Sequence, residues 1–141
     1  MKKIRARAWV EIRRHIVNIL SEEWYRKRGK HYRKPCFLTA YQLAVLLTKF
    51  LDAEDPDLPD LRREMVDNVG GKGTTGPNSA ANQIAWHLVK DLNGGCNDIE
   101  HQFFSLSGLD KNGFMFDNGE VPYENEFSMF RINPCSAKQC I

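Results

Sequence analysis

The residue pattern of this chain changes at Ile99, and that change limits the folds available to it. Before Ile99 the apolar residues recur every three or four positions, as they do on the buried side of amphipathic helices. After Ile99 the phenylalanines are spread among turn formers such as Asn112-Gly113 and Asn118-Gly119, which is typical of short antiparallel strands. The sequence therefore predicts an α+β domain with three or four helices packed on a small C-terminal antiparallel sheet.

The first two helices are predicted from periodicity and from end signals. One covers about residues 5–20, and the stretch from Ser21 to Pro35 is interpreted as a basic loop or a frayed helix end. The next begins after Thr39, which forms an S/T-x-x-E/Q capping box with Gln42, and Leu38 is placed to pack on Leu43 across the first turn.

Two further helices and three strands complete the expected order. A short helix over residues 61–69 stops at Gly70-Gly71, and a longer helix over residues 78–92, capped by Asn78 or Ser79, ends at Gly94-Gly95. Strands are expected near residues 100–106, 113–117 and 127–132. The 141 residues suit one domain. Its parts are a basic helical segment (1–34), a helical part (37–93), the strands (99–132) and a mobile tail (133–141).

Charge is distributed unevenly along the chain. Residues 1–34 hold 12 Lys/Arg and 3 Asp/Glu, a balance of +9, whereas residues 35–141 hold 8 and 15, a balance of −7. Such asymmetry favours a polyanion as partner for the basic part. The alternative is that the basic segment folds onto the acidic remainder of the same chain.

Composition also limits the compartment and the chemistry. The apolar stretches near residues 43–47 and 84–89 fall far short of the ~20 residues that span a bilayer, and the start lacks an apolar signal region, which together predict a cytoplasmic protein without a membrane partner. No metal or cofactor is expected, because the four cysteines form no C-x-x-C pair; they are Cys36, Cys96, Cys135 and Cys140.

Helices followed by a small antiparallel sheet match the outline of a winged helix-turn-helix, in which the second helix of a pair enters the major groove. The expected exposed N-terminal face of the 78–92 helix carries Asn78, Ser79, Asn82, Gln83 and Trp86. Asparagine and glutamine amides can donate to and accept from the edge of adenine. Just before them, Lys72, Thr74 and Thr75 are candidates for positioning a phosphate. The weakness is the turn, with about eight residues where three or four are usual, so a helical hairpin with an ordinary polar surface stays open.

The basic segment supplies the candidate phosphate contacts. Trp24, Tyr25 and Tyr32 are interleaved with basic residues there, a pairing that suits single-stranded nucleic acid. The basic residues are Arg26, Lys27, Arg28, Lys30, Arg33 and Lys34. The sequence thus favours a nucleic-acid-binding module, in which this cluster contacts phosphates while Asn82 and Gln83 reach base edges.

Two other classes of function remain as alternatives. A small enzyme or toxin-like protein is one, although the glycine-rich run at residues 70–76 lacks Walker spacing and the four histidines share no motif. The other is an interaction module, including a homodimer, that would present the Trp9 and Ile16 side of the first helix as a docking surface.

Three segments carry a resemblance to a family. They are Gly70-Gly71-Lys72-Gly73 through Asn78-Ser79, Phe37-Leu38-Thr39-Ala40-Tyr41-Gln42, and Ser128-Met129-Phe130-Arg131-Ile132. Over residues 37–132 the chain resembles uncharacterised bacterial proteins of mobile integron gene cassettes. The resemblance implies a small bacterial protein of undetermined role and transfers no catalytic residue.

Overall fold

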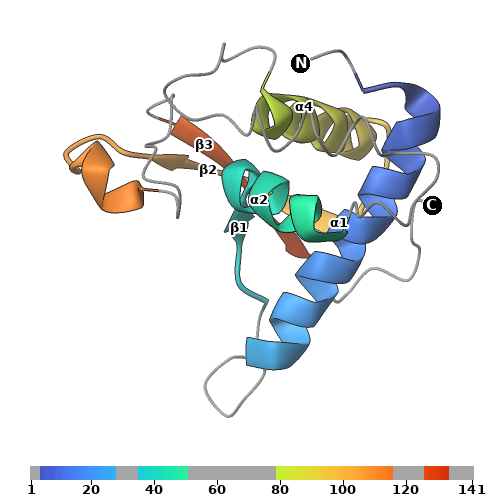
Figure 1. Ribbon diagram of the computed structural model, residues 1–141, viewed down its shortest axis with the longest axis horizontal. Helices are drawn as coiled ribbons and strands as arrows, with labels where there is room; N and C mark the ends of the chain where they lie inside the picture. Colours follow the sequence, from blue (N-terminus) through green and yellow to red (C-terminus); the bar gives the residue numbers. More distant parts are fainter. Residues whose placement is uncertain (1–3, 28–34, 51–78, 116–125, 134–141) are drawn as a thin grey trace.

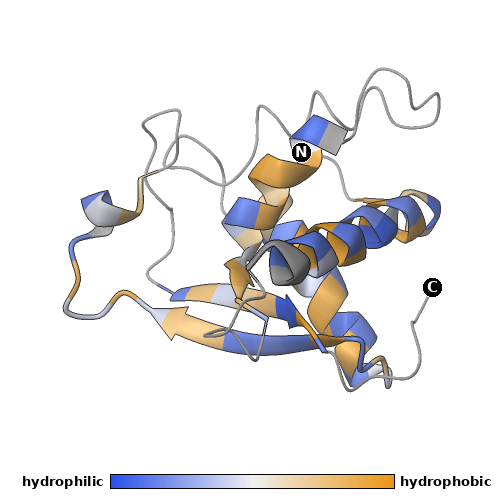
Figure 2. Ribbon diagram, turned by 90° about the horizontal axis from the view of Figure 1, so that it is seen from below, coloured by the Kyte–Doolittle hydropathy of each residue, from blue (hydrophilic) through white to orange (hydrophobic). Residues whose placement is uncertain are grey.

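The computed structural model describes residues 4–27, 35–50, 79–115 and 126–133, which form a layer of helices on one side of a small sheet (Figure 1 and Figure 2). The elements in chain order are α1 (Ala6–Lys27), β1 (Leu38–Thr39), α2 (Ala40–Phe50), α4 (Ala80–Asn93), β2 (Ile99–Ser105), the 3-10 helix η2 (Lys111–Phe114) and β3 (Glu126–Ile132). The three strands pair antiparallel in the order β1-β3-β2. The predicted α+β class is confirmed.

Helix α1 is longer than the sequence pattern predicts. It continues through residues 21–27, so of the two interpretations of this stretch the loop is wrong for these residues and a helix end is correct. The extension is helical because Glu22, Glu23, Arg26 and Lys27 are all good helix formers, although the apolar stripe has ended. The buried side of α1 is formed by Trp9, Ile12, Ile16, Val17, Ile19 and Leu20.

The capping box at the start of α2 is confirmed. The Thr39 N–H donates to Gln42 Oε1 at 2.8 Å, and the Gln42 N–H donates to Thr39 Oγ1 at 3.1 Å. Leu38 and Leu43 are both buried in the core, as a hydrophobic staple requires. These contacts satisfy backbone donors that the first turn of a helix cannot satisfy itself.

Both ends of α4 follow their sequence signals. Ser79 is the N-cap, since its Oγ accepts from the Asn82 N–H at 3.1 Å. At the other end the Gly94 N–H bonds back to the helix, and Gly95 has a φ of +105°, a conformation that suits glycine. The helix therefore begins and ends where the sequence predicts.

The sheet confirms two of the three expected strands and adds one. Strands β2 and β3 pair over their whole length, with Ile99 opposite Ile132 and Ser105 opposite Glu126. The expected strand at 113–117 is wrong where it is described: residues 111–114 form η2, because the Asp110 side chain accepts from the Asn112 N–H at 3.0 Å and closes a tight turn. Strand β1 was not predicted from the sequence, and its two residues pair with β3.

One buried cluster joins the helices to the sheet. Phe130 on β3 is fully buried, and α1 and α2 both contact this strand. The largest other buried side chains are Ile12, Ile16, Leu20, Leu43, Leu47, Ile84 and Leu88. The predicted helix at 61–69 and the predicted tail at 134–141 lie outside the described residues.

Among the helices in the described ranges, none has the length and apolarity that crossing a membrane requires.

Candidate functional site

Most of the predicted phosphate-binding residues lie outside the described part of the chain. These are Arg28, Lys30, Arg33, Lys34, Lys72, Thr74 and Thr75, and Asn78 of the predicted helix face also lies outside it. Arg26 and Lys27 are the last two residues of α1. Ser79, Asn82 and Gln83 are described, and all three belong to the N-terminal part of α4.

The expectation that Ser79 and Gln83 lie on an exposed face is wrong. Ser79 is 3% exposed and serves as the N-cap, and Gln83 is 7% exposed. The Gln83 Oε1 accepts a hydrogen bond from the Ile4 N–H at 2.7 Å, which ties the chain just before α1 to α4. Gln83 therefore faces the interior, and its amide is not presented to a ligand. Asn82, one position earlier, is partly exposed.

The exposed side of α4 carries a different set of residues. Positions three or four apart share one face of a helix, so a single stripe runs along the element. This outward stripe of α4 consists of Asn82, Ala85, Trp86, Val89, Lys90 and Asn93, of which Ala85 and Val89 also pack partly against the core. Its ends are 11 residues apart, which corresponds to roughly 16 Å at the rise of an α-helix. Apart from two small apolar residues, it offers amides, an indole and an ammonium.

Trp86 dominates the outward stripe and is held in place by its neighbours. The side chain is 52% exposed. The His87 ring meets it edge-on with 4.9 Å between ring centroids, and His87 in turn stacks on the buried Trp9 at 4.6 Å. Lys90 Nζ lies 5.0 Å from the Trp86 ring centroid, within the range of a cation–π contact. The exposed Trp86 indole is thus oriented by its contact with His87, and the Lys90 ammonium lies over its ring.

A second exposed aromatic ring lies on the sheet. Phe103 on β2 is 71% exposed and is opposite Ser128 on β3. His101 is two residues before Phe103 on β2, so both side chains lie on the same side of the sheet. His101 is opposite Phe130 on β3. His101 Nε2 is 3.1 Å from Ser128 Oγ, and its ring stacks on Phe130 at 4.9 Å. Burial lowers the pKa of His101 below its usual 6.5, so the imidazole is neutral at pH 7.

The two aromatic rings border adjoining hollows between α4 and β3. One, of about 230 Å³, is lined by Phe103, Glu126 and the first turns of α4 and α2. The other, of about 510 Å³, is lined by the outward stripe of α4. Both share Asn82, Ala85 and Ser128, so they form one continuous surface that we call the α4–β3 hollow. Lys90, Phe103 and Ser128 were not among the residues predicted from the sequence.

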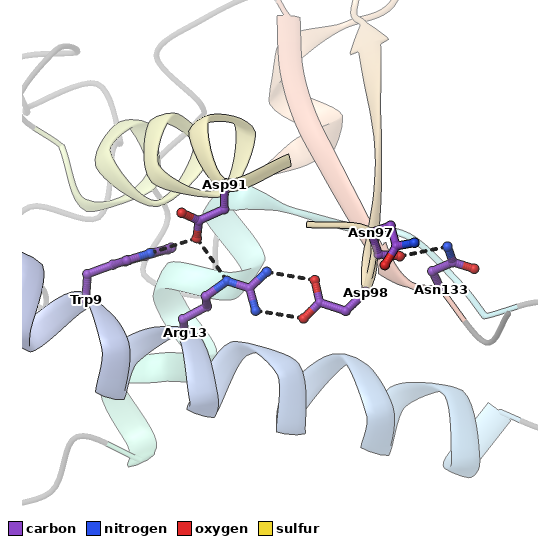
Figure 3. A network of polar contacts seen from close by, with 6 residues as sticks. All are labelled: Trp9, Arg13, Asp91, Asn97, Asp98 and Asn133. Atoms are coloured by element: carbon purple, nitrogen blue, oxygen red, sulfur yellow. Dashed lines mark hydrogen bonds and ion pairs between the residues drawn. The ribbon is translucent and has the colours of Figure 1, made fainter. Parts of the chain in front are cut away.

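A buried ion pair fixes α1 against the far end of α4 (Figure 3). Arg13 Nη1 and Nη2 each donate to one oxygen of Asp98 at 2.7 Å, and Arg13 Nε donates to Asp91 Oδ2 at 2.9 Å. The same Asp91 oxygen accepts from Trp9 Nε1 at 3.0 Å. Bonding to the Asp98 carboxylate raises the pKa of Arg13 further above its usual value, although burial acts against it. The guanidinium stays charged and bidentate.

This network supports the intramolecular alternative for one residue of the basic segment. Arg13 pairs with two carboxylates of the acidic remainder, whereas Arg7 and Arg14 on the same helix, and Arg5 just before it, are exposed. The exposed Arg14 bonds Glu11 at 3.0 Å within its own helix. The basic charge of α1 is thus divided between the interior and the surface.

The docking surface suggested for α1 is not available. Trp9 is 7% exposed and Ile16 is fully buried, and both belong to the core cluster shared with α2, α4 and the sheet. The stripe that would have bound a partner helix is instead covered by this chain itself. That correction removes the structural basis for a dimer formed through Trp9 and Ile16.

Within the described ranges no group of three or more His, Cys, Asp or Glu side chains is arranged to hold a metal ion. Comparisons with protein-family models, with curated proteins and with solved structures found no match.

Proposed function

We propose that the protein is a nucleic-acid-binding module with a winged-helix-like order of elements, in which the exposed side of α4 carries the binding residues. The order of the described elements supports this proposal. Helix α1 and strand β1 come before α2 and α4, and the paired strands β2 and β3 come after them. In the sheet, β1 lies beside β3. Helices followed by a small antiparallel sheet match the outline of a winged helix-turn-helix.

The observation that carries the proposal is the outward stripe of α4. Asn82, Trp86 and Lys90 follow one another at four-residue intervals along a helix whose opposite side, with Ile84 and Leu88, is buried. An asparagine amide can pair with a base edge, and a lysine ammonium suits a phosphate. Trp86 adds a ring that can contact a base by its face or edge.

Nearby positive charge supports the same surface. The Ile4 N–H donates to Gln83, so the start of α1 lies against the first turns of α4. Arg5 and Arg7 follow directly and are exposed. Arg26 and Lys27, with the basic residues of 28–34, remain proposed phosphate contacts at the other end of α1.

Fluorescence anisotropy with labelled random-sequence DNA and RNA at two salt concentrations tests this proposal. Replacing Lys90 with Gln should weaken binding to every sequence and reduce the slope of log K against log salt by roughly one unit, as expected for one lost phosphate contact. Lys49→Gln is the matched control, because Lys49 is an exposed lysine in the last turn of α2. If the wild-type protein binds none of these polymers at low salt, the proposal is wrong.

A further inference from the structure

We infer that the α4–β3 hollow binds the unpaired bases of a single strand in preference to duplex nucleic acid. This inference rests on the proposed function and names its ligand class. Its basis is two exposed aromatic rings, Trp86 and Phe103, each of which lines one of the two parts of the hollow.

The exposure of these rings is the first argument. Single apolar side chains are common on protein surfaces, but Phe103 is 71% and Trp86 is 52% exposed, and both border one hollow. Nucleobases in a duplex are stacked on each other and present only their edges in the grooves. An unpaired base offers its face, and stacking on aromatic side chains is the contact that single-strand binders use.

The polar groups near the rings are the second argument. Asn82 and Ser128 line both parts of the hollow, and each is near one of the rings: Asn82 is four residues before Trp86 on α4, and Ser128 is opposite Phe103 in the sheet. An amide and a hydroxyl can each bond to the edge of a base whose face is stacked nearby. Lys90 Nζ lies over the Trp86 ring at 5.0 Å from its centroid, so an ammonium that a phosphate can bind is close to this ring.

The buried start of α4 is the third argument, because it disfavours the duplex. A recognition helix in the major groove contacts base edges with its N-terminal residues. Here Ser79 is used as the cap and Gln83 bonds the Ile4 backbone, so two of the four polar residues predicted for that role are directed inward. The outward stripe of α4, rather than its N-terminal end, is therefore available to a ligand.

Anisotropy titrations with a labelled oligonucleotide, as single-stranded DNA, single-stranded RNA and the DNA duplex, test the inference. We expect both single strands to bind at least tenfold more tightly than the duplex. Trp86→Ala and Phe103→Ala should each weaken single-strand binding by about 5- to 150-fold, the range given by 1–3 kcal/mol per stacked base. Trp86→Phe should retain most of the affinity, because it retains a ring.

Leu109→Ala is the matched control, since Leu109 is 53% exposed but does not line the hollow. Circular dichroism of each variant confirms that it is folded. Duplex binding that equals or exceeds single-strand binding, or alanine variants that bind single strands like wild type, would overturn the inference while leaving nucleic-acid binding intact. Absence of binding to all three probes would instead overturn the proposed function.

Discussion

The buried pair of Arg13 and Asp98 offers the sharpest test of what holds α1 to the rest of the domain. The two side chains are 4% and 3% exposed, and their contact is bidentate. Asp98→Asn removes the negative charge while nearly keeping the shape. It leaves a buried guanidinium with the half-buried Asp91 carboxylate as counter-charge.

The expected loss follows from the cost of an uncompensated buried charge. Removing one partner of such a pair costs about 3–5 kcal/mol. Asp91 remains and the new amide oxygen still accepts one hydrogen bond, so we expect the lower end, about 3 kcal/mol. An unfolding entropy of about 2.1 cal/mol/K per residue over 141 residues then predicts a fall in Tm of about 10 °C.

Thermal and urea unfolding followed by far-UV circular dichroism measure this loss. The double variant Arg13→Met with Asp98→Leu should be more stable than Asp98→Asn, because it removes both charges and fills their space with apolar groups. Glu11→Gln, which breaks the exposed pair with Arg14, is the control and should change stability by less than about 0.5 kcal/mol. The reasoning is refuted by a loss under about 1 kcal/mol for Asp98→Asn, or by a double variant less stable than Asp98→Asn.

Three further variants test separate parts of the fold. Thr39→Ala should cost about 1 kcal/mol in urea unfolding, because it removes the side-chain acceptor of the α2 cap. Phe130→Ala should cost about 3–5 kcal/mol, since the ring is fully buried at the centre of the sheet; a loss near 1 kcal/mol would contradict that placement. Burial lowers the pKa of His101 below 6.5, so the unfolded chain binds more protons than the folded chain between the lowered pKa and 6.5, and stability falls as the pH drops through this window. His101→Gln should flatten that part of the curve of Tm against pH, and an unchanged curve would count against the assignment.

The features that the sequence predicted correctly are those with local causes. The Thr39 capping box, the Ser79 cap and the end of α4 at Gly94-Gly95 depend on hydrogen bonds between residues a few positions apart. Two strands were predicted because, after Ile99, stretches rich in aromatic residues are divided from one another by turn-forming residues. Strand β1 escaped prediction because two residues form a strand only when β3 lies beside them.

The candidate site was less predictable because it depends on tertiary packing. Helical spacing from Trp9 and Ile16 turns Arg13 rather than Arg14 toward the interior, but its counter-charge Asp98 is 85 residues away and could not be assigned from the sequence. Gln83 was taken as exposed because the apolar stripe of α4 omits it, but α4 is buried over a wider arc than that stripe and the amide meets the Ile4 backbone there. The exposure of Phe103 could not be predicted, because the alternation of residues along a strand does not show how far the helices extend over the sheet.

The division of charge on α1 connects the interior of the protein to its proposed binding surface. Arg13 and Trp9 both bond Asp91, so the same carboxylate fixes the rotation of α1 and its position along α4. Trp9 also stacks on His87, and the His87 ring supports Trp86 edge-on. The rotation that buries Arg13 therefore orients the exposed Trp86 indole through the Trp9 and His87 rings, and it leaves Arg7 on the exposed side of α1. A buried ion pair that contributes little net stability can in this way determine which groups the surface presents.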